Sequence, residues 1–363
     1  MIRVIWSEPG VKLPASLLKL HSQSHPMVHP QVSENICRTI RVGPELAGQR
    51  IDKAAAVLLP DYSRTQLTEW IRDGSLTLDG RVVPAKQRVF GDEELALNAA
   101  PPVGARWDVA QIVRFDVVYE DEHLLIIDKP AGVVVHPGAG NPDGTLVNGL
   151  LQIRPALAAL PRAGIVHRLD KDTSGLLAVA ASSVALRSLS EALARHEVTR
   201  RYRAVVEGVL TGGRSIDAPI ARDPGNRLRQ RVASVGRPAL THVQVIERYR
   251  AHCLVNAELA TGRTHQIRVH MASIGHPLVG DRRYGARGRL PSRPSVELLA
   301  AIRGFQRQAL HAAELAFEHP VTGAALAFES PLPLDLAQLI HCLKSDQSGD
   351  PDMRSAGNAV GRS

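Results

Sequence analysis

The sequence has little cysteine and no long apolar run. Its three cysteines (Cys37, Cys253 and Cys342) are few, odd in number and widely separated. They therefore form neither a disulfide framework nor a metal-ligand spacing, and they suit a reducing compartment. No stretch approaches the roughly 20 apolar residues that a membrane-spanning helix needs, and residues 1–38 have no secretion-signal pattern. We expect a cytoplasmic protein without a membrane association, and a monomer by default.

Positive charge is what the sequence has in excess. Lys and Arg number 44 against 36 Asp and Glu, which gives a net charge of +8 and a pI of about 9.7. This balance favours a polyanionic partner, and nucleic acid before a membrane, because no long basic amphipathic helix is present. A hydrophobic content of 44% is typical of a globular protein.

Composition divides the chain into five parts. We expect a disordered N-terminal extension over 1–38, a compact unit over 39–98, a linker over 99–110, a larger domain over 111–344 and a disordered tail over 345–363. The linker begins with a stretch rich in Ala, Pro and Gly, and the tail is polar. The sequence has no internal repeats.

The compact unit has helix and hairpin signals. Apolar periodicity predicts a helix over 51–59 that Pro60 ends, and Ser63 is a candidate N-cap for a second helix. Two short strands, 76–78 and 81–83, are expected to form a hairpin because Asp79-Gly80 between them favours a tight turn.

This succession resembles an S4 RNA-binding domain. The resemblance depends on Arg50-Ile51-Asp52, Ser63-Arg64 and Ile71-Arg72-Asp73-Gly74. It implies that basic side chains of the unit bind phosphate. The candidates are Arg50, Lys53, Arg64 and Arg72.

The larger domain is predicted to be α+β with a mixed, mainly antiparallel sheet. Strands are expected at 117–119 and 124–127, which form a hairpin, and at 202–206, 241–246 and 254–259, with a helix over 184–195. Strands and helices alternate without a regular βαβ rhythm, and this favours a largely antiparallel sheet over a parallel one.

The segment His167–Leu177 places a carboxylate before a buried strand. Asp170 lies in a polar, charged turn, and the apolar run 176–181 that follows is typical of a buried strand. A carboxylate at the end of such a strand can be fixed beside a pocket, as acid–base or nucleophilic chemistry requires. A lone Asp before a strand is more often a turn residue, but Arg168, Lys171 and Thr173 around it suggest an anion site.

Two further segments carry suitable partners. Period-two alternation places Tyr202 on the core side of its strand, where its ring could stack on a base. Thr264 could cap a helix with the apolar stripe Ile267, Met271 and Ile274, and Arg268 would lie at the edge of that stripe. A buried guanidinium needs a partner, and a carboxylate such as Asp170 would be kept ionised by it.

Several motifs in order resemble the RluA-type pseudouridine synthases. The Asp170 segment matches their signature H-R-L-D-x-x-T-S-G-L, and the resemblance extends over nearly all of the chain after residue 40. It includes Asp128–Gly132, Val135–Gly138, Gly280-Asp281 and Arg307–Ala312.

The resemblance implies roles for particular residues. Asp170 would attack the ribose or remove a proton from it, and Arg268 would pair with Asp170. Tyr202 would pack on the uracil and assist proton removal at C5. Arg168 matches the residue that enters the RNA where the target uridine flips out. The chain is most similar to the RluD-like branch, which implies 23S ribosomal RNA or a large-subunit precursor as partner, the helix 69 loop as target, and a role in subunit assembly.

A basic loop adds candidate RNA contacts. Arg222, Arg227 and Arg229 lie beside Pro224-Gly225-Asn226, so we expect a loop that touches phosphate. No cofactor is expected, because the isomerisation needs none, and no metal, because His265 and His270 would diverge on a helix.

Other functions remain open at this point. The chain could be a non-catalytic RNA-binding assembly factor, or a synthase that acts on transfer RNA or another ribosomal position. A glycoside hydrolase would need a second carboxylate within about 5–10 Å of Asp170, and only Asp172 lies near in sequence.

Overall fold

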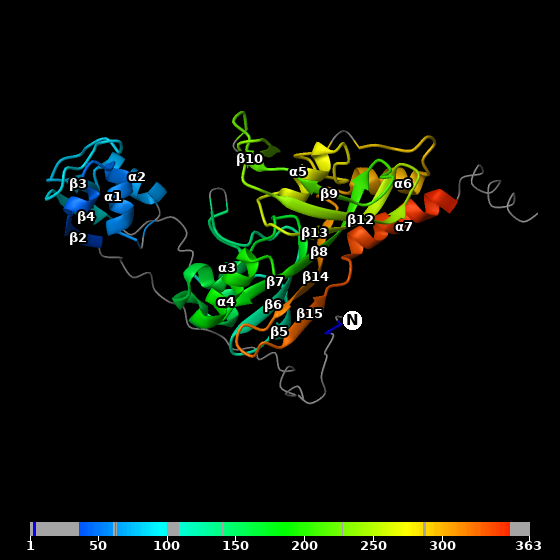
Figure 1. The fold of residues 1–363 in the computed structure, drawn as a ribbon, viewed down its shortest axis with the longest axis horizontal. Helices are drawn as coiled ribbons and strands as arrows, with labels where there is room; N and C mark the ends of the chain where they lie inside the picture. The colour runs from blue at the N-terminus through cyan, green and yellow to red at the C-terminus, as the bar shows by residue number, and fades with distance from the viewer. Residues whose placement is uncertain are drawn as a thin grey trace, which may run out of the picture. The chain divides into compact units, whose positions relative to one another are not determined.

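The computed structural model describes most of the chain. The described residues are 3–4, 36–60, 62, 64–99, 109–138, 141–226, 228–285 and 288–348. Most of the expected extension, linker and tail, together with Ser63 and Arg227, lies outside them. The chain forms two compact units, residues 12–106 and residues 1–11 with 107–363, and each is described by itself below (Figure 1). None of the helices in these ranges is long and apolar enough to cross a lipid bilayer.

The smaller unit packs two helices on a three-stranded antiparallel sheet. Its strand order is β2-β4-β3, and Ile51, Leu67, Ile71 and Leu95 are among its fully buried core residues. The elements are β2 (Ile36–Arg41), the 3-10 helix η1 (Pro44–Leu46), α1 (Ile51–Leu58), α2 (Arg64–Asp73), β3 (Leu76–Leu78) and β4 (Glu94–Ala99).

The hairpin expected over 76–83 was wrong in its second strand. Asp79 and Gly80 do form a tight turn with positive φ angles, and a single bridge joins Leu78 to Arg81. The chain then leaves the sheet, because Pro84 has no N–H to continue a ladder. β3 pairs with the more distant strand β4.

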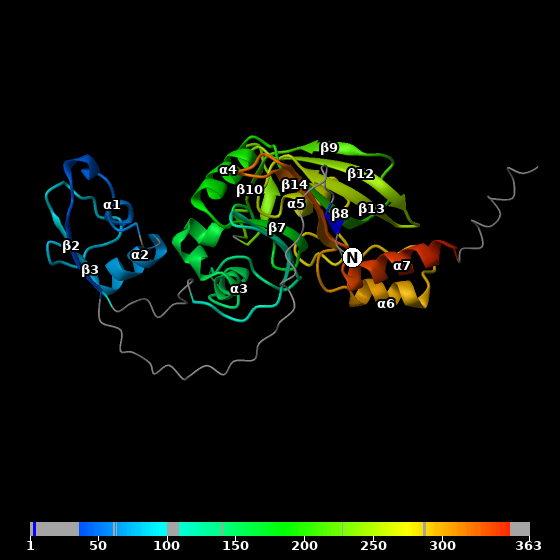
Figure 2. The same cartoon turned by 90° about the horizontal axis from the view of Figure 1, so that it is seen from below.

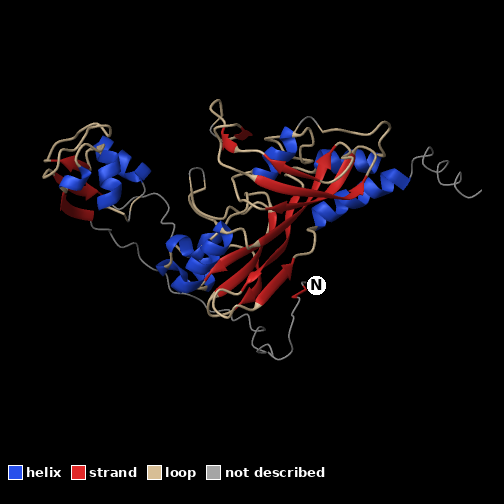
Figure 3. Cartoon of the chain, viewed as in Figure 1, coloured by secondary structure: helices blue, strands red, loops and turns tan. Residues whose placement is uncertain are grey.

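The larger unit is built on one twisted sheet of ten strands (Figure 3). The strand order is β5-β6-β7-β14-β8-β13-β12-β9, with β15 beside β14 and β1 beside β15. All neighbouring strands are antiparallel except β7 and β14, so the prediction of a mixed, mainly antiparallel sheet is confirmed.

The bounds of the larger unit's elements follow the chain. The strands of the sheet are β1 (Arg3–Val4), β5 (Asp116–Glu120), β6 (Leu124–Lys129), β7 (Ser174–Ala180), β8 (Thr199–Glu207), β9 (Arg214–Asp217), β12 (Leu240–Arg248), β13 (His252–Leu259), β14 (Leu310–Glu318) and β15 (Ala325–Glu329). A separate hairpin consists of β10 (Ile220–Arg222) and β11 (Gln230–Val232). The helices are α3 (Leu146–Ile153), the 3-10 helices η2 (Pro155–Ala159) and η3 (Pro161–Gly164), α4 (Ser183–Ala194), α5 (Gln266–Ser273), α6 (Val296–Gly304) and α7 (Leu334–Ser348).

Strand β7 is buried on both faces, as its continuous apolar run predicted. Leu177 and Val179 pack in the cluster that includes α3. Leu176 and Ala178 point to the opposite face and pack in the cluster that includes α4. Burial on both sides fixes the register of β7, and with it the position of the turn that precedes the strand.

Helices α6 and α7 cover another part of the sheet. Helices α6 and α7 lie side by side (Figure 2). They pack through Leu298, Leu336 and Leu339 against Val205 and Leu254 of β8 and β13. An apolar layer therefore supports β8 and β13 from this side.

Candidate active site

Asp170 lies in the turn directly before β7. The turn leads directly into β7, where Gly175 has a φ of +111°. A Cβ atom at Gly175 would lie 2.2 Å from the carbonyl oxygen of Ala312 in β14. Only glycine allows this close approach of β7 and β14, so the Ser-Gly pair of the signature holds the turn against the sheet. The Asp170 side chain is 17% exposed.

Arg268 reaches the same point from α5. The expected N-cap at Thr264 was wrong, because the cap is His265, which adopts a left-handed conformation with a φ of 58°. The side chain of Gln266 fastens this turn instead. Its Oε1 accepts from Thr261 Oγ1 at 2.7 Å and from the backbone N–H of Arg263 at 3.0 Å.

The Arg268 guanidinium is shared by two carboxylates. Its Nη1 donates to Asp170 Oδ2 at 2.8 Å, and its Nε and Nη2 donate to Asp281 at 2.7 and 2.9 Å. The Arg268 side chain is 8% exposed, and that of Asp281 is fully buried. Burial opposes the charge of Arg268, but hydrogen bonds and attraction from both carboxylates raise its pKa above the ordinary value. The expected pairing of Arg268 with Asp170 is therefore present.

Asp281 is a site residue to which no role could be assigned from the sequence. Burial alone would raise the pKa of its carboxyl, but the hydrogen bonds and charge of Arg268 hold the pKa below the ordinary value. The backbone N–H groups of Arg283 and Tyr284 also donate to Asp281. Gly280-Asp281 was visible only as a matched motif, and the bidentate geometry identifies Asp281 as the support of Arg268.

Lys129 is a second residue near Asp170 to which no role could be assigned from the sequence. It ends β6, and its fully buried Nζ donates to the carbonyl oxygens of Pro130, Val133 and Lys171 at 2.8 to 3.0 Å. Burial lowers its pKa to about 7, although the nearby carboxylates of Asp172 and Asp170 oppose this shift. Lys129 thus ties the residue after Asp170 to the end of β6.

Tyr202 lies on the core face of β8, as its alternation predicted. It is buried, and it also lines the cleft that contains Asp170. Burial raises the pKa of its hydroxyl to about 12, with Arg200 opposing the shift. The hydroxyl therefore stays protonated at neutral pH.

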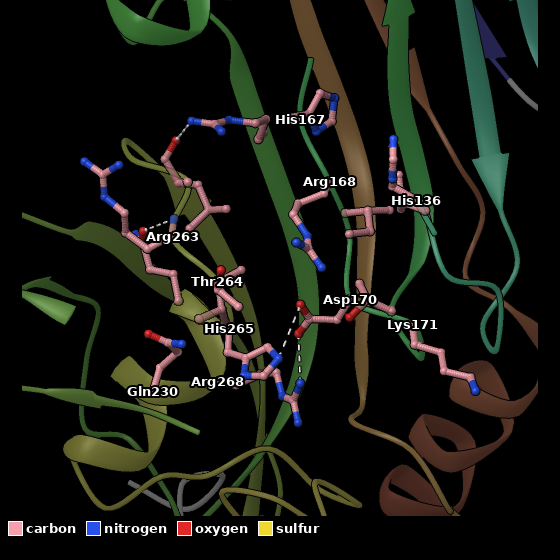
Figure 4. Close-up of a pocket in the computed structure, with 18 of the residues that line it drawn as sticks. His136, His167, Arg168, Asp170, Lys171, Gln230, Arg263, Thr264, His265 and Arg268 are labelled. Atoms are coloured by element: carbon pink, nitrogen blue, oxygen red, sulfur yellow. Dashed lines mark hydrogen bonds and ion pairs between the residues drawn. The ribbon is translucent and has the colours of Figure 1, made fainter. Parts of the chain in front are cut away.

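These residues line one large basic cleft of about 1410 Å³. Its only acidic lining residues among those described are Asp170 and Asp172, against nine cations. The cations are Arg162, Arg168, Lys171, Arg200, Arg222, Arg237, Arg263, Arg268 and Arg283. In Figure 4 the Arg168 side chain extends toward Asp170, whereas Lys171 extends away from it. A cleft with this excess of positive charge attracts a polyanion, and Asp170 is the group within it that could react.

Some of the predicted RNA contacts line this cleft. Arg222 does so from the β10–β11 hairpin, where the exposed Leu228, which was not among the predicted contacts, also lines the cleft. Arg229, on the same hairpin, is exposed, and its guanidinium lies 5.4 Å from the ring centre of Tyr284. Arg227 lies outside the described residues.

The other predicted contacts belong to the smaller unit. Lys53 and Arg72 are exposed. Arg50 and Arg64 both form ion pairs with the buried Asp52, at 2.9 and 2.6 Å, while their side chains remain 40% and 49% exposed. These two arginines therefore have a structural contact beside any role in binding.

Comparison with known proteins gives consistent matches. Residues 123–273 match the family model described as RNA pseudouridylate synthase. The protein "Ribosomal large subunit pseudouridine synthase D" of Pseudomonas aeruginosa is 49% identical over 87% of this chain and 98% of its own length. The Escherichia coli K12 protein of the same name is 46% identical over 87% of this chain and 97% of its own length. A solved structure titled "Human RNA Pseudouridylate Synthase Domain Containing 1" aligns with a TM-score of 0.49 and 28% identity, covering 64% of this chain and 89% of that one.

Proposed function

This chain belongs to the pseudouridine synthase family, the isomerases that act on RNA, and we propose that it converts uridine to pseudouridine in RNA of the large ribosomal subunit. The observation that carries the proposal is the Asp170 carboxylate, held by Arg268 at the base of a cleft lined with cations. The names of the relatives above support the choice of RNA.

The chemistry needs few polar groups because it is an isomerisation. The bond between N1 of uracil and C1′ of the ribose breaks, the base rotates, and a bond from C5 to C1′ forms. C5 then loses its proton and N1 takes one up, so no atom is gained or lost. Asp170 either adds to C1′ as the first bond breaks and leaves again when C5 bonds to C1′, or removes the proton from C2′ and returns it at the end. In both cases it acts as a carboxylate, and the guanidinium of Arg268 favours that charged form.

Tyr202 and Arg168 are assigned to the uridine itself. The ring of Tyr202 borders the cleft on a rigid strand and can pack against the detached uracil. Its hydroxyl stays protonated at neutral pH, which favours packing over a role as base. Arg168 is exposed beside Asp170 and can fill the place that the target base leaves when it flips out of its stack.

The helix 69 loop of 23S ribosomal RNA is the target that we assign, with modification supporting assembly of the large subunit in the cytoplasm. The exposed arginines of the β10–β11 hairpin and the S4-like unit over 39–98 would bind the phosphates around that loop. This assignment depends on the RluD-like resemblance and on the names of the relatives.

Release of tritium from 23S RNA labelled with [5-³H]uridine tests the proposal. The wild-type protein should release tritium without added metal or nucleotide, because the C5 proton is lost. Asp170→Asn should abolish release while retaining RNA affinity. The substitution replaces one carboxylate oxygen by an NH2 group and removes no contact to phosphate. Mapping of the modified positions then tests helix 69.

Different results would redirect the proposal. Release that maps to another loop or to transfer RNA would retain the chemistry and overturn the target. If neither protein releases tritium from naked RNA or from large-subunit precursors, the reaction on this RNA is wrong, and RNA binding without turnover would favour an assembly factor.

A further inference from the structure

His265 lies beside Arg268 and faces the other oxygen of the Asp170 carboxylate (Figure 4). Its Nε2 is 3.9 Å from Asp170 Oδ1, while Arg268 holds Oδ2 (Figure 4). Its second ring nitrogen, Nδ1, lies 2.7 Å from the hydroxyl of Tyr284. Both oxygens of Asp170 therefore face a nitrogen group of α5 or its cap.

Contacts around Tyr284 favour one of the two tautomers of the His265 ring. The Tyr284 hydroxyl oxygen accepts the backbone N–H of Gln230 at 2.8 Å, so its own hydrogen is free to be donated to Nδ1. Nδ1 is then the acceptor, and the ring proton is on Nε2, toward Asp170. The other tautomer would direct a lone pair of Nε2 at a carboxylate, which is unfavourable.

The ring is neutral in this setting. Burial lowers the pKa of His265, and the charges of Arg268 and Arg283 lower it further, against the attraction of Asp170. A neutral ring with one N–H is a directional donor. Its distance to Asp170 Oδ1 exceeds a direct hydrogen bond by about 1 Å, a gap that a small movement on substrate binding would close.

We propose that His265 is a positioning residue for the reacting carboxylate: Tyr284 holds it with its Nε2–H toward Asp170, so that His265 and Arg268 together fix the orientation of Asp170. This inference rests on the proposed function, because it needs Asp170 to be the reacting group. His270 of the same helix has no such role, since its two ring nitrogens contact Thr241 Oγ1 and Ala218 O.

The same contacts tie this arrangement to the β10–β11 hairpin. Gln230 belongs to β11, and the neighbouring Arg283 donates through Nη1 to the carbonyl oxygen of Leu228 at 2.7 Å. The segment Asp281–Tyr284 therefore holds Arg268 through its first residue and the hairpin through its last two. RNA that settles on the hairpin would act on the orientation of His265 through Tyr284.

Steady-state tritium release from labelled 23S RNA separates positioning from binding. His265→Ala should lower kcat about 10- to 100-fold with little change in KM, because a displaced reacting group slows the chemistry. His265→Gln should restore kcat to within about threefold of wild type, because the glutamine amide places an N–H near the position of Nε2. Tyr284→Phe should lower kcat about three- to tenfold.

The matched control is Tyr249→Phe. The Tyr249 hydroxyl donates to Glu247 Oε2 at 3.1 Å, and its ring is buried in the apolar cluster of α6 and α7. Tyr249→Phe should leave kcat and KM unchanged. An inactive wild type would overturn the proposed function. An active wild type whose kcat survives in His265→Ala, or falls equally in His265→Gln, would overturn the role of His265 alone.

The protonated nitrogen can be measured without turnover. Long-range ¹⁵N–¹H spectra of histidine-labelled full-length protein, with His265→Gln to assign the signal, should show the proton on Nε2. Tyr284→Phe should weaken that preference. A proton on Nδ1 in the wild type would overturn the proposal.

Discussion

At the scale of single residues, the site depends on how one guanidinium divides its donors. Asp281 takes two of the three Arg268 contacts from a fully buried position, and this leaves Nη1 directed at Asp170. The orientation of Arg268 is therefore set by a residue that does not touch the cleft: Asp281 is absent from its lining.

Asp281→Asn should accordingly affect both stability and turnover. It leaves Arg268 with one carboxylate in place of two, and loss of a partner of a buried charge costs about 3 kcal/mol. The misplaced guanidinium should lower kcat about 100-fold. Urea unfolding and tritium release measure the two effects.

Asp335→Asn is the control for that change. Asp335 also receives two hydrogen bonds from one arginine, Arg307, but its side chain is 48% exposed. Water can reach the Asp335 side, and Arg307, 10% exposed, keeps its contacts to backbone carbonyl oxygens, so this loss should cost less than about 1 kcal/mol. Equal losses of stability in the two variants would contradict the importance of burial at Asp281.

His311 gives a prediction on pH. It is buried on β14, where its Nδ1 lies 3.0 Å from Ser174 Oγ at the start of β7. Burial lowers its pKa to about 4, against the opposing effect of the Ser330 carbonyl. In the unfolded chain the His311 ring binds a proton with a pKa near 6.5. Its contribution to the free energy of unfolding is therefore complete above that pH. It is lost as the pH falls toward 4, by at most about 1.4 kcal/mol per pH unit.

Urea unfolding between pH 7 and 4 checks this contribution. His311→Gln cannot take up a proton in this range, so its free energy of unfolding should fall less steeply than that of the wild type. Parallel curves for the two proteins would show that His311 does not titrate with folding.

At the scale of elements, the β10–β11 hairpin should bind RNA by charge. Arg222→Ala and Arg229→Ala should each weaken binding and reduce the salt slope by about one, as for a lost phosphate contact. Titrations of 23S RNA at several salt concentrations measure both quantities. Arg303→Ala removes an exposed arginine on α6 instead, and it should change neither. A salt slope that persists in both hairpin variants would contradict the contact.

The elements also show what could be predicted from the sequence. Local sequence patterns were sufficient where the burial of a residue depends on its own strand alone. The apolar run of β7 and the alternation that turns Tyr202 to the core were both correct. The cap of α5 at Thr264 was wrong, because the left-handed turn at His265 is stabilised by the side chain of Gln266, which no local pattern reveals.

Contacts across the chain were harder to predict. The pairing of Arg268 with Asp170, 98 positions apart, was expected because a buried guanidinium needs a carboxylate. The same argument could not select Asp281 as the second carboxylate. The three carbonyl contacts of Lys129 depend on how three loops meet, and composition carries no signal for that.

At the scale of the whole molecule, basic surface occurs in both units. The larger unit has the cleft, and the smaller unit exposes Lys53 and Arg72. If the smaller unit binds RNA outside the target loop, as its S4-like sequence predicts, it should add affinity for long RNA without affecting the chemistry.

The double variant Lys53→Glu/Arg72→Glu tests whether the smaller unit contributes to RNA affinity and not to the chemistry. With 23S RNA it should raise KM about tenfold or more and leave kcat unchanged, because two phosphate contacts become repulsions while Asp170 and Arg268 are untouched. With a short stem-loop that holds only the target uridines, KM should stay close to that of wild type, since the RNA would not extend to a second binding surface. Arg303→Glu is the control, because it reverses an exposed charge on α6 of the larger unit. An equal rise in KM with both RNAs would mean that the smaller unit contacts the target loop itself, and an unchanged KM with both would remove it from RNA binding.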